Sequence, residues 1–409
     1  MLSLQTTILW AFYFFAGVSI VLGLLSLRGG LRFVRYVQSE LGKEIPDFTP
    51  FVTVFLPCRG IDDGLKENIA SLFAQDYPAF EVVFVCDADD DPALGIIDEA
   101  RRSYQGATGP VVGTVIAGAA KESGQKVHNL RVAVREANPK SEVFVFTDTD
   151  ARHQPFWLRC LVAPLRDEKI GAATGYRWFI PVNGGLASHL QSIWNASIAS
   201  ALGGQSEKNF CWGGSTAIRR ETFARLNIRE RWRGTLSDDF TVTRVLHEAG
   251  LAIKFVPHCL TPSFEDCTLA QLLEFTTRQM KITRAYAPHL WRAVLLGSLI
   301  FVVAFFGGLA LVIVRAASGL SFATPLALIA VMFLLGAMKA HFRLRLVAQI
   351  ISDARLQKGS TTVAQVVLWP LASLLFFYNA VAAFSRRIKW RGITYELKSP
   401  TETVILSAE

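Results

Sequence analysis

Residues 143–150 read Val-Phe-Val-Phe-Thr-Asp-Thr-Asp, an apolar run that ends in two carboxylates. Four consecutive apolar residues, two of them Val, predict a strand buried on both faces, as in a parallel sheet. Asp148 and Asp150 then lie at the carboxyl end of that strand, where open α/β sheets bind ligands. Such a pair can share Mg²⁺ or Mn²⁺, which typically reaches protein through one or two carboxylates plus substrate phosphates. An isolated Asp-x-Asp is more often a solvated turn, so the interpretation depends on the remaining sequence.

Buried strands and amphipathic helices alternate on both sides of this run. Asp62 or Asp63 is expected to cap the first helix, by accepting a hydrogen bond from its backbone. No Gly-x-Gly-x-x-Gly or Walker-type loop follows the first strand, which disfavours a dehydrogenase or a P-loop NTPase. The alternation predicts an α/β fold with a doubly wound, mostly parallel sheet. Further strands are predicted at 52–56, 81–86 and 111–116. The first predicted helix carries Leu65, Ile69, Leu72 and Phe73 on one face and ends at Tyr77-Pro78, and further helices are predicted at 96–104 and 126–136.

Three uncharged stretches, 8–27, 293–314 and 320–338, are long enough to cross a bilayer. With 409 residues and 51% apolar content, the chain also exceeds an ordinary soluble domain. The first stretch is predicted to be an anchor rather than a signal peptide, because basic residues follow it and none precedes it. The positive-inside rule places its carboxyl side in the cytosol. A further stretch, 363–384, either crosses or re-enters the bilayer, because Pro370 interrupts it and four basic residues follow it.

These segments predict four parts of the chain. They are an N-terminal membrane anchor (1–31), a cytosol-facing catalytic domain (32–291), a transmembrane or re-entrant region (292–385) and a basic C-terminal tail (386–409). The formal charge of +8 fits the basic cytosolic flanks of a membrane protein. The sequence contains no basic stripe interleaved with aromatic residues, so we do not predict binding of nucleic acid. The six cysteines contain no Cys-x-x-Cys pair, and we interpret them as small buried residues in a reducing compartment.

Two further acidic clusters accompany the Asp-Thr-Asp pair. Asp87 and Asp89 follow the predicted strand 81–86, and Asp238 and Asp239 precede a predicted helix. Asp-rich turns are common, so each cluster alone has an ordinary explanation as a solvated loop. Because the carboxyl ends of parallel strands converge on one crevice, we expect the three clusters to form one site.

Two smaller features could contribute to the same site. Gly213 and Gly214 would let the backbone come close to a ligand, although a tight turn also explains them. Lys126 and Asn129, three residues apart, share one face of a predicted helix and could reach the same ligand. A surface Lys beside an interior Asn is the alternative interpretation.

Taken in order, these motifs resemble the inverting nucleotide-sugar glycosyltransferases of the GT-A fold. The Asp-Asp-Asp-Pro-Ala segment at 89–93, the membrane arrangement and Trp-Arg-Gly-Ile-Thr-Tyr at 390–395 narrow the resemblance to the ceramide glucosyltransferases. It covers nearly the whole chain, and it is more specific for fold and reaction than for the lipid. The motifs that carry the order are Phe-Leu-Pro at 55–57, Gln-Asp-Tyr-Pro at 75–78, the first acidic cluster, Lys-Val-His-Asn-Leu at 126–130, Asp-Thr-Asp at 148–150, Gly-Gly-Ser at 213–215 and Asp-Asp at 238–239.

The resemblance implies a role for each cluster. Asp148 and Asp150 would hold Mn²⁺ or Mg²⁺ on the diphosphate of a UDP-sugar, where the metal assists the leaving group. Asp239 would be the general base that takes the proton from the acceptor hydroxyl. Asp238 stands where the family more often has Glu. The residues implied to line the donor site are Asp87 and Asp89 at the uridine, with Lys126, Asn129, Gly213, Gly214, Asp238, Arg278 and Lys281 around the remainder.

One element departs from the family pattern. Relatives carry Gln/Arg-x-x-Arg-Trp, whereas this chain has Arg-Gln-Met-Lys-Ile at 278–282. Arg278 and Lys281 still share one helix face and could meet a diphosphate, or they could form a basic face on the membrane. Ile282 stands where relatives have Trp, so the indole ring is missing. Its absence argues against a processive polymerase and does not define which sugar is transferred.

The sequence therefore predicts a membrane-anchored, cytosol-facing, metal-dependent glycosyltransferase. It would move a sugar, with glucose favoured, from UDP to the hydroxyl of ceramide or a similar lipid, at a bacterial inner membrane or a Golgi or ER membrane. A polyisoprenyl-phosphate glycosyltransferase is the first alternative, because its anionic acceptor needs no strong base. A processive polysaccharide synthase would need more membrane spans. A non-catalytic membrane protein that binds a nucleotide-sugar or scaffolds partners is the remaining alternative.

Overall fold

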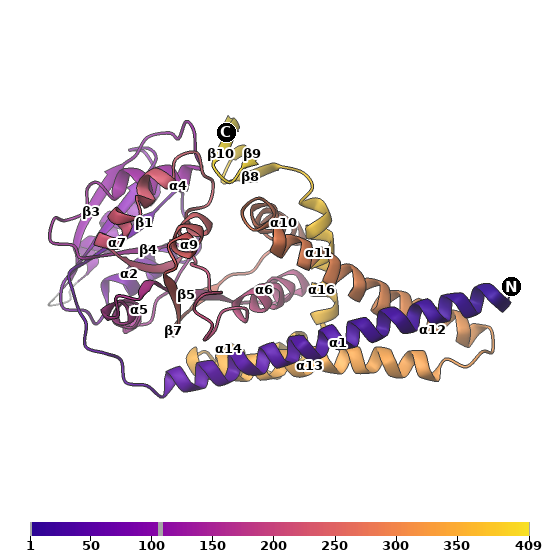
Figure 1. Cartoon of the computed structure of the whole chain (residues 1–409). Coiled ribbons are helices and arrows are strands. Elements are labelled where there is room, and N and C mark those ends of the chain that lie inside the picture. The colour runs from indigo at the N-terminus through magenta and orange to yellow at the C-terminus, as the bar shows by residue number, and fades with distance from the viewer. Residues whose placement is uncertain (1, 105–108, 409) are drawn as a thin grey trace. The chain divides into compact units, whose positions relative to one another are not determined.

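The computed structural model describes residues 2–104 and 109–408, and the chain divides into two compact units (Figure 1). We call them the sheet unit and the helical unit. The chain passes between the units after Arg35, Ile180, Ser200, Glu265 and Ser385, so the predicted part 32–291 is shared between them. The sheet unit consists of Tyr36–Ile180, Ala201–Glu265 and Arg386–Glu409, and the helical unit consists of Met1–Arg35, Pro181–Ser200 and Asp266–Ser385.

The sheet unit is built on a seven-stranded sheet with the strand order β3-β2-β1-β4-β6-β5-β7. The pairs β1–β2, β2–β3, β1–β4 and β5–β7 are parallel, whereas β6 runs antiparallel to both β4 and β5. The predicted mostly parallel α/β sheet is confirmed. Its strands are β1 (Val52–Pro57), β2 (Phe80–Cys86), β3 (Val111–Ile116), β4 (Val143–Thr147), β5 (Ile170–Ile180), β6 (Ser215–Arg219) and β7 (Ala252–Phe264).

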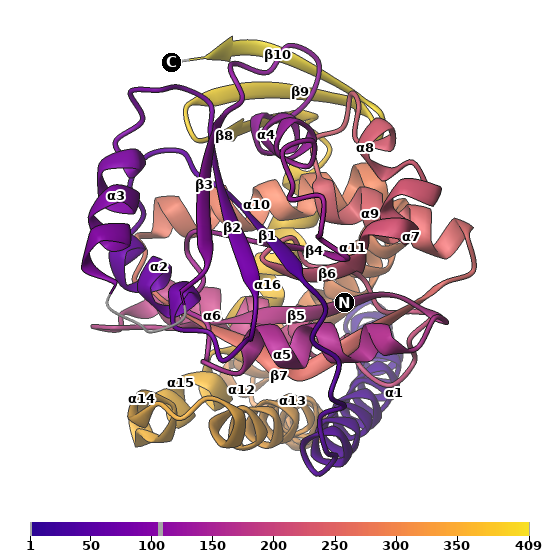
Figure 2. The same ribbon diagram turned by 90° about the vertical axis from the view of Figure 1, so that its left-hand side faces the viewer.

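Helices cover both faces of this sheet. Along β1, Val54 and Leu56 enter the core that contains α2, α3 and α5, while Phe55 enters the core that contains α4 and α9. Figure 2 shows α2 and α3 on one side of β1–β3 and α4 on the other. β1, β2 and β4 are buried almost throughout, as predicted. The helices are α2 (Leu65–Phe73), α3 (Ala93–Ser103), α4 (Gln125–Ala133), α5 (Trp157–Val162), the short 3₁₀ turn Ala163–Arg166, α7 (Arg220–Arg225), α8 (Ile228–Arg231) and α9 (Asp238–Glu248).

Two helix starts matter for the site. The predicted cap on α2 is wrong, because Gly64, with φ +72°, precedes this helix and no side chain caps it. Asp62 instead accepts a hydrogen bond from the hydroxyl of Thr149. At α9, the Ser237 hydroxyl accepts from the backbone N–H of Phe240 at 3.3 Å. This cap holds the acidic pair 238–239 in the first turn, where the helix dipole favours negative charge.

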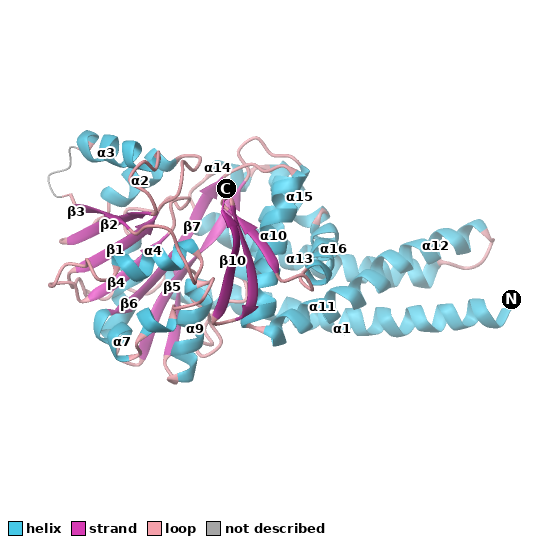
Figure 3. Cartoon of the chain, turned by 90° about the horizontal axis from the view of Figure 1, so that it is seen from above, coloured by secondary structure: helices cyan, strands magenta, loops and turns pink. Residues whose placement is uncertain are grey.

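The segment predicted as a basic tail folds into a second sheet with the order β10-β9-β8. Its strands are antiparallel and belong to the sheet unit. Figure 3 shows these strands in magenta, with β10 labelled. Ile393, Tyr395 and Leu397 are buried and recur with the period of two that a strand requires, and Ile388 is buried on the preceding strand. The strands are β8 (Arg387–Trp390), β9 (Ile393–Ser399) and β10 (Glu402–Ala408).

Within the described residues, three helical stretches are long and apolar enough to cross a membrane: Leu4–Leu41, Pro288–Ala317 and Ala323–Ile350. They contain the predicted spans 8–27 and 293–314 and all but the first three residues of the predicted span 320–338. Most of the stretch 363–384 falls in the helix pair Gly359–Val367 and Trp369–Ala382, which is bent by 51° and fits a broken span or a re-entrant loop, so both predicted alternatives stay open. The elements are α1 (Leu2–Leu41), α6 (Leu186–Ala199), α10 (Leu269–Tyr286), α11 (Pro288–Val302), a π turn (Val303–Gly307), α12 (Gly308–Ala317), α13 (Ala323–Ile350), α14 (Ala354–Gln357), α15 (Gly359–Val367) and α16 (Trp369–Ala382).

The helical unit exposes apolar side chains outward. Phe12 of α1 packs with Phe305 and Ile329 in an internal core. By contrast, Phe14 is 67% exposed and Ile313 is 69% exposed. Exposed apolar residues of this kind indicate contact with an apolar phase, and together with the span lengths they indicate association with a membrane.

Candidate functional site

Lys126 connects two of the three acidic clusters. It lies in the first turn of α4, and its Nζ is 2.7 Å from Oδ1 of Asp148 and 3.4 Å from Oδ1 of Asp238. Burial alone would lower the pKa of Lys126, but the neighbouring carboxylates, Asp148 first, outweigh burial and raise that pKa. Lys126 is therefore a fixed cation between the end of β4 and the start of α9.

Arg177 on β5 is a site residue that our sequence reasoning missed. Its Nη1 lies 2.8 Å from Oδ2 of Asp150, and its Nη2 lies 3.3 Å from Oδ2 of Asp148. The guanidinium also lies over the rings of Trp212 and Phe179, 5.0 Å and 5.3 Å from their centroids. Arg177 is the one charged residue of the strand β5, and a charge in a buried strand requires a carboxylate partner. That signal was present in the sequence.

The acids around Lys126 differ in their proton affinity. Burial would raise the pKa of Asp148, but Lys126 and Arg177 outweigh it and hold that pKa below its usual value. Burial raises the pKa of Asp238 to about 6 despite the nearby lysine, and the repulsion from Asp239 acts in the same direction. One carboxylate is thus held as an anion, while its neighbour titrates near neutral pH. Such a division is typical of catalytic sites.

Asp239 is held by three hydrogen-bond donors at the start of α9. Its Oδ1 accepts from the Ser237 hydroxyl and, at 2.7 Å, from the N–H of Phe240. Its Oδ2 accepts from the N–H of Gly213 at 3.2 Å. Asp239 is partly exposed, whereas Asp238 is 5% exposed.

The two glycines make room for the charged groups. A Cβ on Gly213 would lie 2.6 Å from Oδ2 of Asp238 and 2.8 Å from Nζ of Lys126. A Cβ on Gly214 would lie 2.2 Å from the ring of Trp212. Only glycine allows the backbone to pass this close to the site.

The cluster after β2 is built differently. Asp87 forms an ion pair with Arg59, Nη1 to Oδ2, at 2.7 Å. Asp89 is exposed. Asp91 accepts hydrogen bonds from the backbone N–H groups of Gly60 and Ala93, so it orders the loop before α3.

Three other predicted residues lie in different surroundings. Asn129 is buried, and its Oδ1 accepts from Nε2 of Gln125 at 2.7 Å. Arg278 and Lys281 lie on α10 of the helical unit, where the Arg278 guanidinium is 5.6 Å from the ring centroid of Phe275. The structure therefore gathers Lys126, Asp148, Asp150, Gly213, Gly214, Asp238 and Asp239 in one site of the sheet unit.

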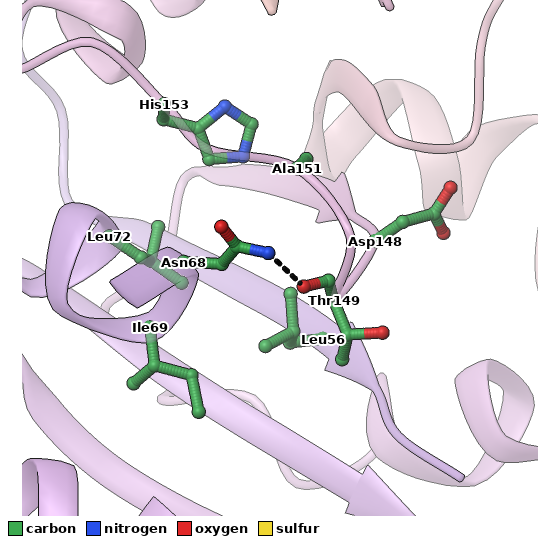
Figure 4. Close-up of a pocket in the computed structure, with 8 residues that line it drawn as sticks. All are labelled: Leu56, Asn68, Ile69, Leu72, Asp148, Thr149, Ala151 and His153. Atoms are coloured by element: carbon green, nitrogen blue, oxygen red, sulfur yellow. Dashed lines mark hydrogen bonds between the residues drawn. The ribbon is translucent and has the colours of Figure 1, made fainter. Parts of the chain in front are cut away.

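A small cavity lies beside the loop after β4 (Figure 4). Its volume is about 10 Å³, room for a single water molecule and far too little for a nucleotide. Nδ2 of Asn68 donates to the carbonyl oxygen of Thr149 at 2.9 Å, which fixes the loop that carries the Asp-Thr-Asp pair. The lining residues are Leu56, Asn68, Ile69, Leu72, Asp148, Thr149, Ala151 and His153.

The candidate metal ligands in this site are the carboxylates of Asp148 and Asp150. No group of three or more His, Cys, Asp or Glu side chains converges as a metal cage within the described part of the chain. Asp148 and Asp150 still fit Mg²⁺ or Mn²⁺, because these hard cations take oxygen ligands and keep positions for phosphates and water. Lys126 and Arg177 hold the same oxygens, so a metal would share the pair with them.

The fold and the site define a membrane-associated α/β protein with a charged site at the carboxyl edge of its sheet. Within that class, the chain belongs to glycosyl transferase family 21, whose model matches residues 11–403.

Curated relatives match over shorter stretches. The chain is 27% identical over 85 residues to a ceramide glucosyltransferase from Komagataella phaffii, covering 21% of this chain and 17% of that protein. It is 22% identical over 249 residues to ceramide glucosyltransferase 1 from Caenorhabditis elegans, covering 60% of this chain and 52% of the relative. The matched stretches thus span about half, or less, of the relatives' own lengths.

Among solved structures, the chain is similar to a mannosyltransferase from Pyrobaculum calidifontis in complex with GDP-Man and Mn²⁺. The identity is 17% and the TM-score is 0.48, over 90% of this chain and 99% of that one.

Proposed function

We propose that this protein is an inverting glycosyltransferase that moves a sugar, with glucose favoured, from UDP to the hydroxyl of ceramide or a similar membrane lipid. The observation that carries the proposal is the Lys126 bridge between Asp148 and Asp238. It brings a pair suited to a metal next to a pair suited to proton transfer. Membership of glycosyl transferase family 21, the ceramide glucosyltransferase relatives and the apolar helices support it.

The carboxylate pair at the end of β4 is proposed to hold Mn²⁺ or Mg²⁺. When bound there, the cation would neutralise charge on the diphosphate leaving group. Lys126 and Arg177 already neutralise Asp148 and Asp150, so a polyanionic donor could approach two carboxylates without strong repulsion. Arg177 could also reach phosphate oxygens, because its planar fork suits them.

Asp239 is proposed as the general base. A lipid hydroxyl is a poor nucleophile while it keeps its proton, so displacement at the anomeric carbon needs a base within hydrogen-bond reach. Asp239 is partly exposed and fixed by its three donors, which suits contact with an acceptor. Asp238 is buried against Lys126, which suits a role in positioning this cation.

The remaining predicted residues complete the proposed donor site. Asp87 and Asp89 would hold the uridine, because carboxylate oxygens accept from the N–H and O–H groups of a nucleoside. Arg278 and Lys281 would meet the diphosphate. The two residues are spaced three apart on α10, which places them on one face of that helix.

We also propose that the sheet unit faces the cytosol, because the apolar stretch of α1 is followed by Arg28, Arg32 and Arg35. Cysteine-accessibility labelling in intact cells tests this orientation. Labelling of a cysteine introduced near Arg35 from outside the cell would contradict it.

The function is tested with the purified full chain, a panel of UDP-sugars and a total lipid extract, with the product analysed by mass spectrometry. We expect one hexose on a lipid that carries a free hydroxyl, released together with UDP. The Asp239→Asn variant is the control for catalysis by this site. A product on a polyisoprenyl phosphate would select the first alternative, and the absence of UDP release with every lipid would overturn the proposal.

A further inference from the structure

The turn between β8 and β9 holds an arginine in a conformation that arginine disfavours. Trp390 pairs with Ile393, so only Arg391 and Gly392 form the turn, and their φ values are +47° and +78°. A two-residue turn with both φ values positive is normally Asn-Gly, Asp-Gly or Gly-Gly. Among the described residues, Asn227 is the other non-glycine residue with positive φ, and asparagine tolerates that conformation. Retained backbone strain of this kind is concentrated at functional sites.

The contacts of Arg391 lead into the candidate site. Its Nη1 donates to the carbonyl oxygen of Arg59 at 2.6 Å, and its Nη2 lies 2.5 Å from Oδ1 of Asp62. Asp62 also accepts from the hydroxyl of Thr149, the residue between the two carboxylates at the end of β4. Arg59 in turn holds Asp87. Arg391 therefore connects the loop after β4 with the loop that supports the cluster after β2.

The position of Arg391 is fixed by the packing of its sheet. Tyr395 on β9 is 1% exposed, and its hydroxyl accepts from the N–H of Gln125, the residue before Lys126, at 3.2 Å. A Cβ on Gly234 would lie 2.2 Å from the carbonyl oxygen of Thr401, so the sheet packs closely there. The Arg391 side chain itself stays 39% exposed, so a ligand can reach it.

Arg391 is held as a cation close to the proposed metal pair. Burial would lower the pKa of Arg391, but Asp62 first, and then Asp150 and Asp148, outweigh it and raise that pKa. The cation thus lies within the field of the proposed metal pair. A guanidinium has five N–H donors and can bind two phosphate oxygens at once, and the bonds to Asp62 and to the carbonyl oxygen of Arg59 leave part of this donor capacity available.

We infer that Arg391 binds the diphosphate of the nucleotide donor, and that Asp62 is its partner while the donor is absent. This inference rests on the proposed function, because it assumes a nucleoside diphosphate at the end of β4. In this inference, the C-terminal sheet supplies a cation to the donor site. A purely structural ion pair would not require a strained arginine in this turn.

The test compares nucleotide binding with stability in the full-length protein. Arg391→Asn places in the turn the residue that the conformation prefers, so the melting temperature should stay unchanged or rise. The affinity for UDP with Mn²⁺, measured by calorimetry, should fall about 10- to 100-fold, the usual effect of losing a hydrogen bond to a charged group. The affinity for UMP should fall less, because it lacks the second phosphate.

Two further variants separate a ligand contact from a structural role. Lys398→Gln removes an exposed cation from the same sheet and should bind UDP as the wild type does. Asp62→Asn removes the carboxylate that pairs with Arg391, and it should leave UDP affinity unchanged or higher. If the ion pair were purely structural, Asp62→Asn and Arg391→Asn would lose UDP affinity equally. Unchanged UDP affinity in Arg391→Asn would overturn this inference and leave the proposed function intact. So would equal losses of affinity for UDP and UMP together with a lower melting temperature. Absence of binding of both UDP and GDP to the wild type would instead overturn the proposed function and this inference together.

Discussion

The acidic clusters after β4 and after β2 look alike in the sequence, yet they are built differently. After β4, Asp148 forms ion pairs with Lys126 and Arg177, and Asp150 forms one with Arg177. After β2, Asp87 pairs with Arg59 and Asp89 is exposed. Both carboxylates of the first cluster are thus neutralised within the protein, while the second cluster combines one paired carboxylate, Asp87, with one exposed carboxylate, Asp89.

This difference separates two kinds of ligand. A diphosphate carries several negative charges, so it can approach carboxylates only where cations or a metal compensate them. A nucleoside base and ribose are neutral and offer N–H and O–H donors, from which carboxylate oxygens can accept hydrogen bonds. The β4 cluster therefore suits the charged part of a nucleotide-sugar, and the β2 cluster suits its neutral part.

The largest expected effect is at the β4 cluster. Chelation should reduce transfer to the background rate, and Mn²⁺ or Mg²⁺ should restore it, because the proposed metal needs both carboxylates. Asp150→Asn should lose most of the activity while unfolding at the wild-type temperature, since the residue lies at a strand end. Asp90→Asn, an exposed residue of the β2 cluster, is the control. Full activity in excess chelator would remove the metal from the proposal.

The next effect concerns the acid pair that Lys126 ties to the β4 cluster. Asp239→Asn keeps the size of the side chain but cannot take the acceptor proton, so kcat should fall by about 10²–10⁴-fold. Binding of UDP should remain nearly unchanged, as calorimetry can verify. Asp238→Asn should cost less. Weaker UDP binding with intact turnover of bound donor would make Asp239 a donor ligand instead of a base.

A smaller effect is expected at the β2 cluster. Asp87→Asn should raise KM for the donor about tenfold, the usual cost of one hydrogen bond to a charged group, and leave kcat near the wild-type value. The reason is that a contact with the nucleoside is the same in the ground state and the transition state. Steady-state kinetics with varied UDP-sugar measures both constants. A fall in kcat at unchanged KM would place Asp87 in the chemical step.

The sequence was sufficient for the features that follow from local pattern. The run 143–147 predicted a strand buried on both faces, and β4 has that burial. Asp238 and Asp239 precede a helical periodicity, and they open α9. Both predictions depend on residues adjacent in the chain, whose burial and capping follow the period of the element.

Features that depend on distant pairing could not be predicted in this way. Asp62 had the spacing of a helix cap, but Thr149 and Arg391 compete for its oxygens, and both are remote in the chain. Arg177 needs the β5–β6–β4 order to reach Asp150, because that order sets which strand ends are neighbours. Period-two alternation in the last 25 residues could have revealed the C-terminal sheet, but its place beside α4 rests on the contact of Tyr395 with Gln125.

The smallest expected effect concerns His153, in the loop that follows the β4 cluster. Its ring stacks on Trp157 with a centroid distance of 3.6 Å, and its Nε2 lies 2.7 Å from Oγ1 of Thr147. Burial lowers the pKa of His153 from its usual 6.5 to about 3, although Asp148 acts in the opposite direction. The folded sheet unit therefore keeps this imidazole neutral at mildly acidic pH.

The unfolded chain binds one more proton than the folded chain between these two pKa values, so stability falls as the pH drops through 6.5. Between pH 6.5 and 5.5 the free energy of unfolding should decrease by about 1 kcal/mol because of His153. The His153→Gln variant has no imidazole at this position to titrate. Between pH 6.5 and 5.5 its free energy of unfolding should therefore fall by about 1 kcal/mol less than that of the wild type, whatever its absolute stability. Urea unfolding at the two pH values, followed by tryptophan fluorescence, measures the difference. Equal losses in both proteins would show that His153 is not held neutral, and that the loop after β4 is as open to protons as the cluster after β2.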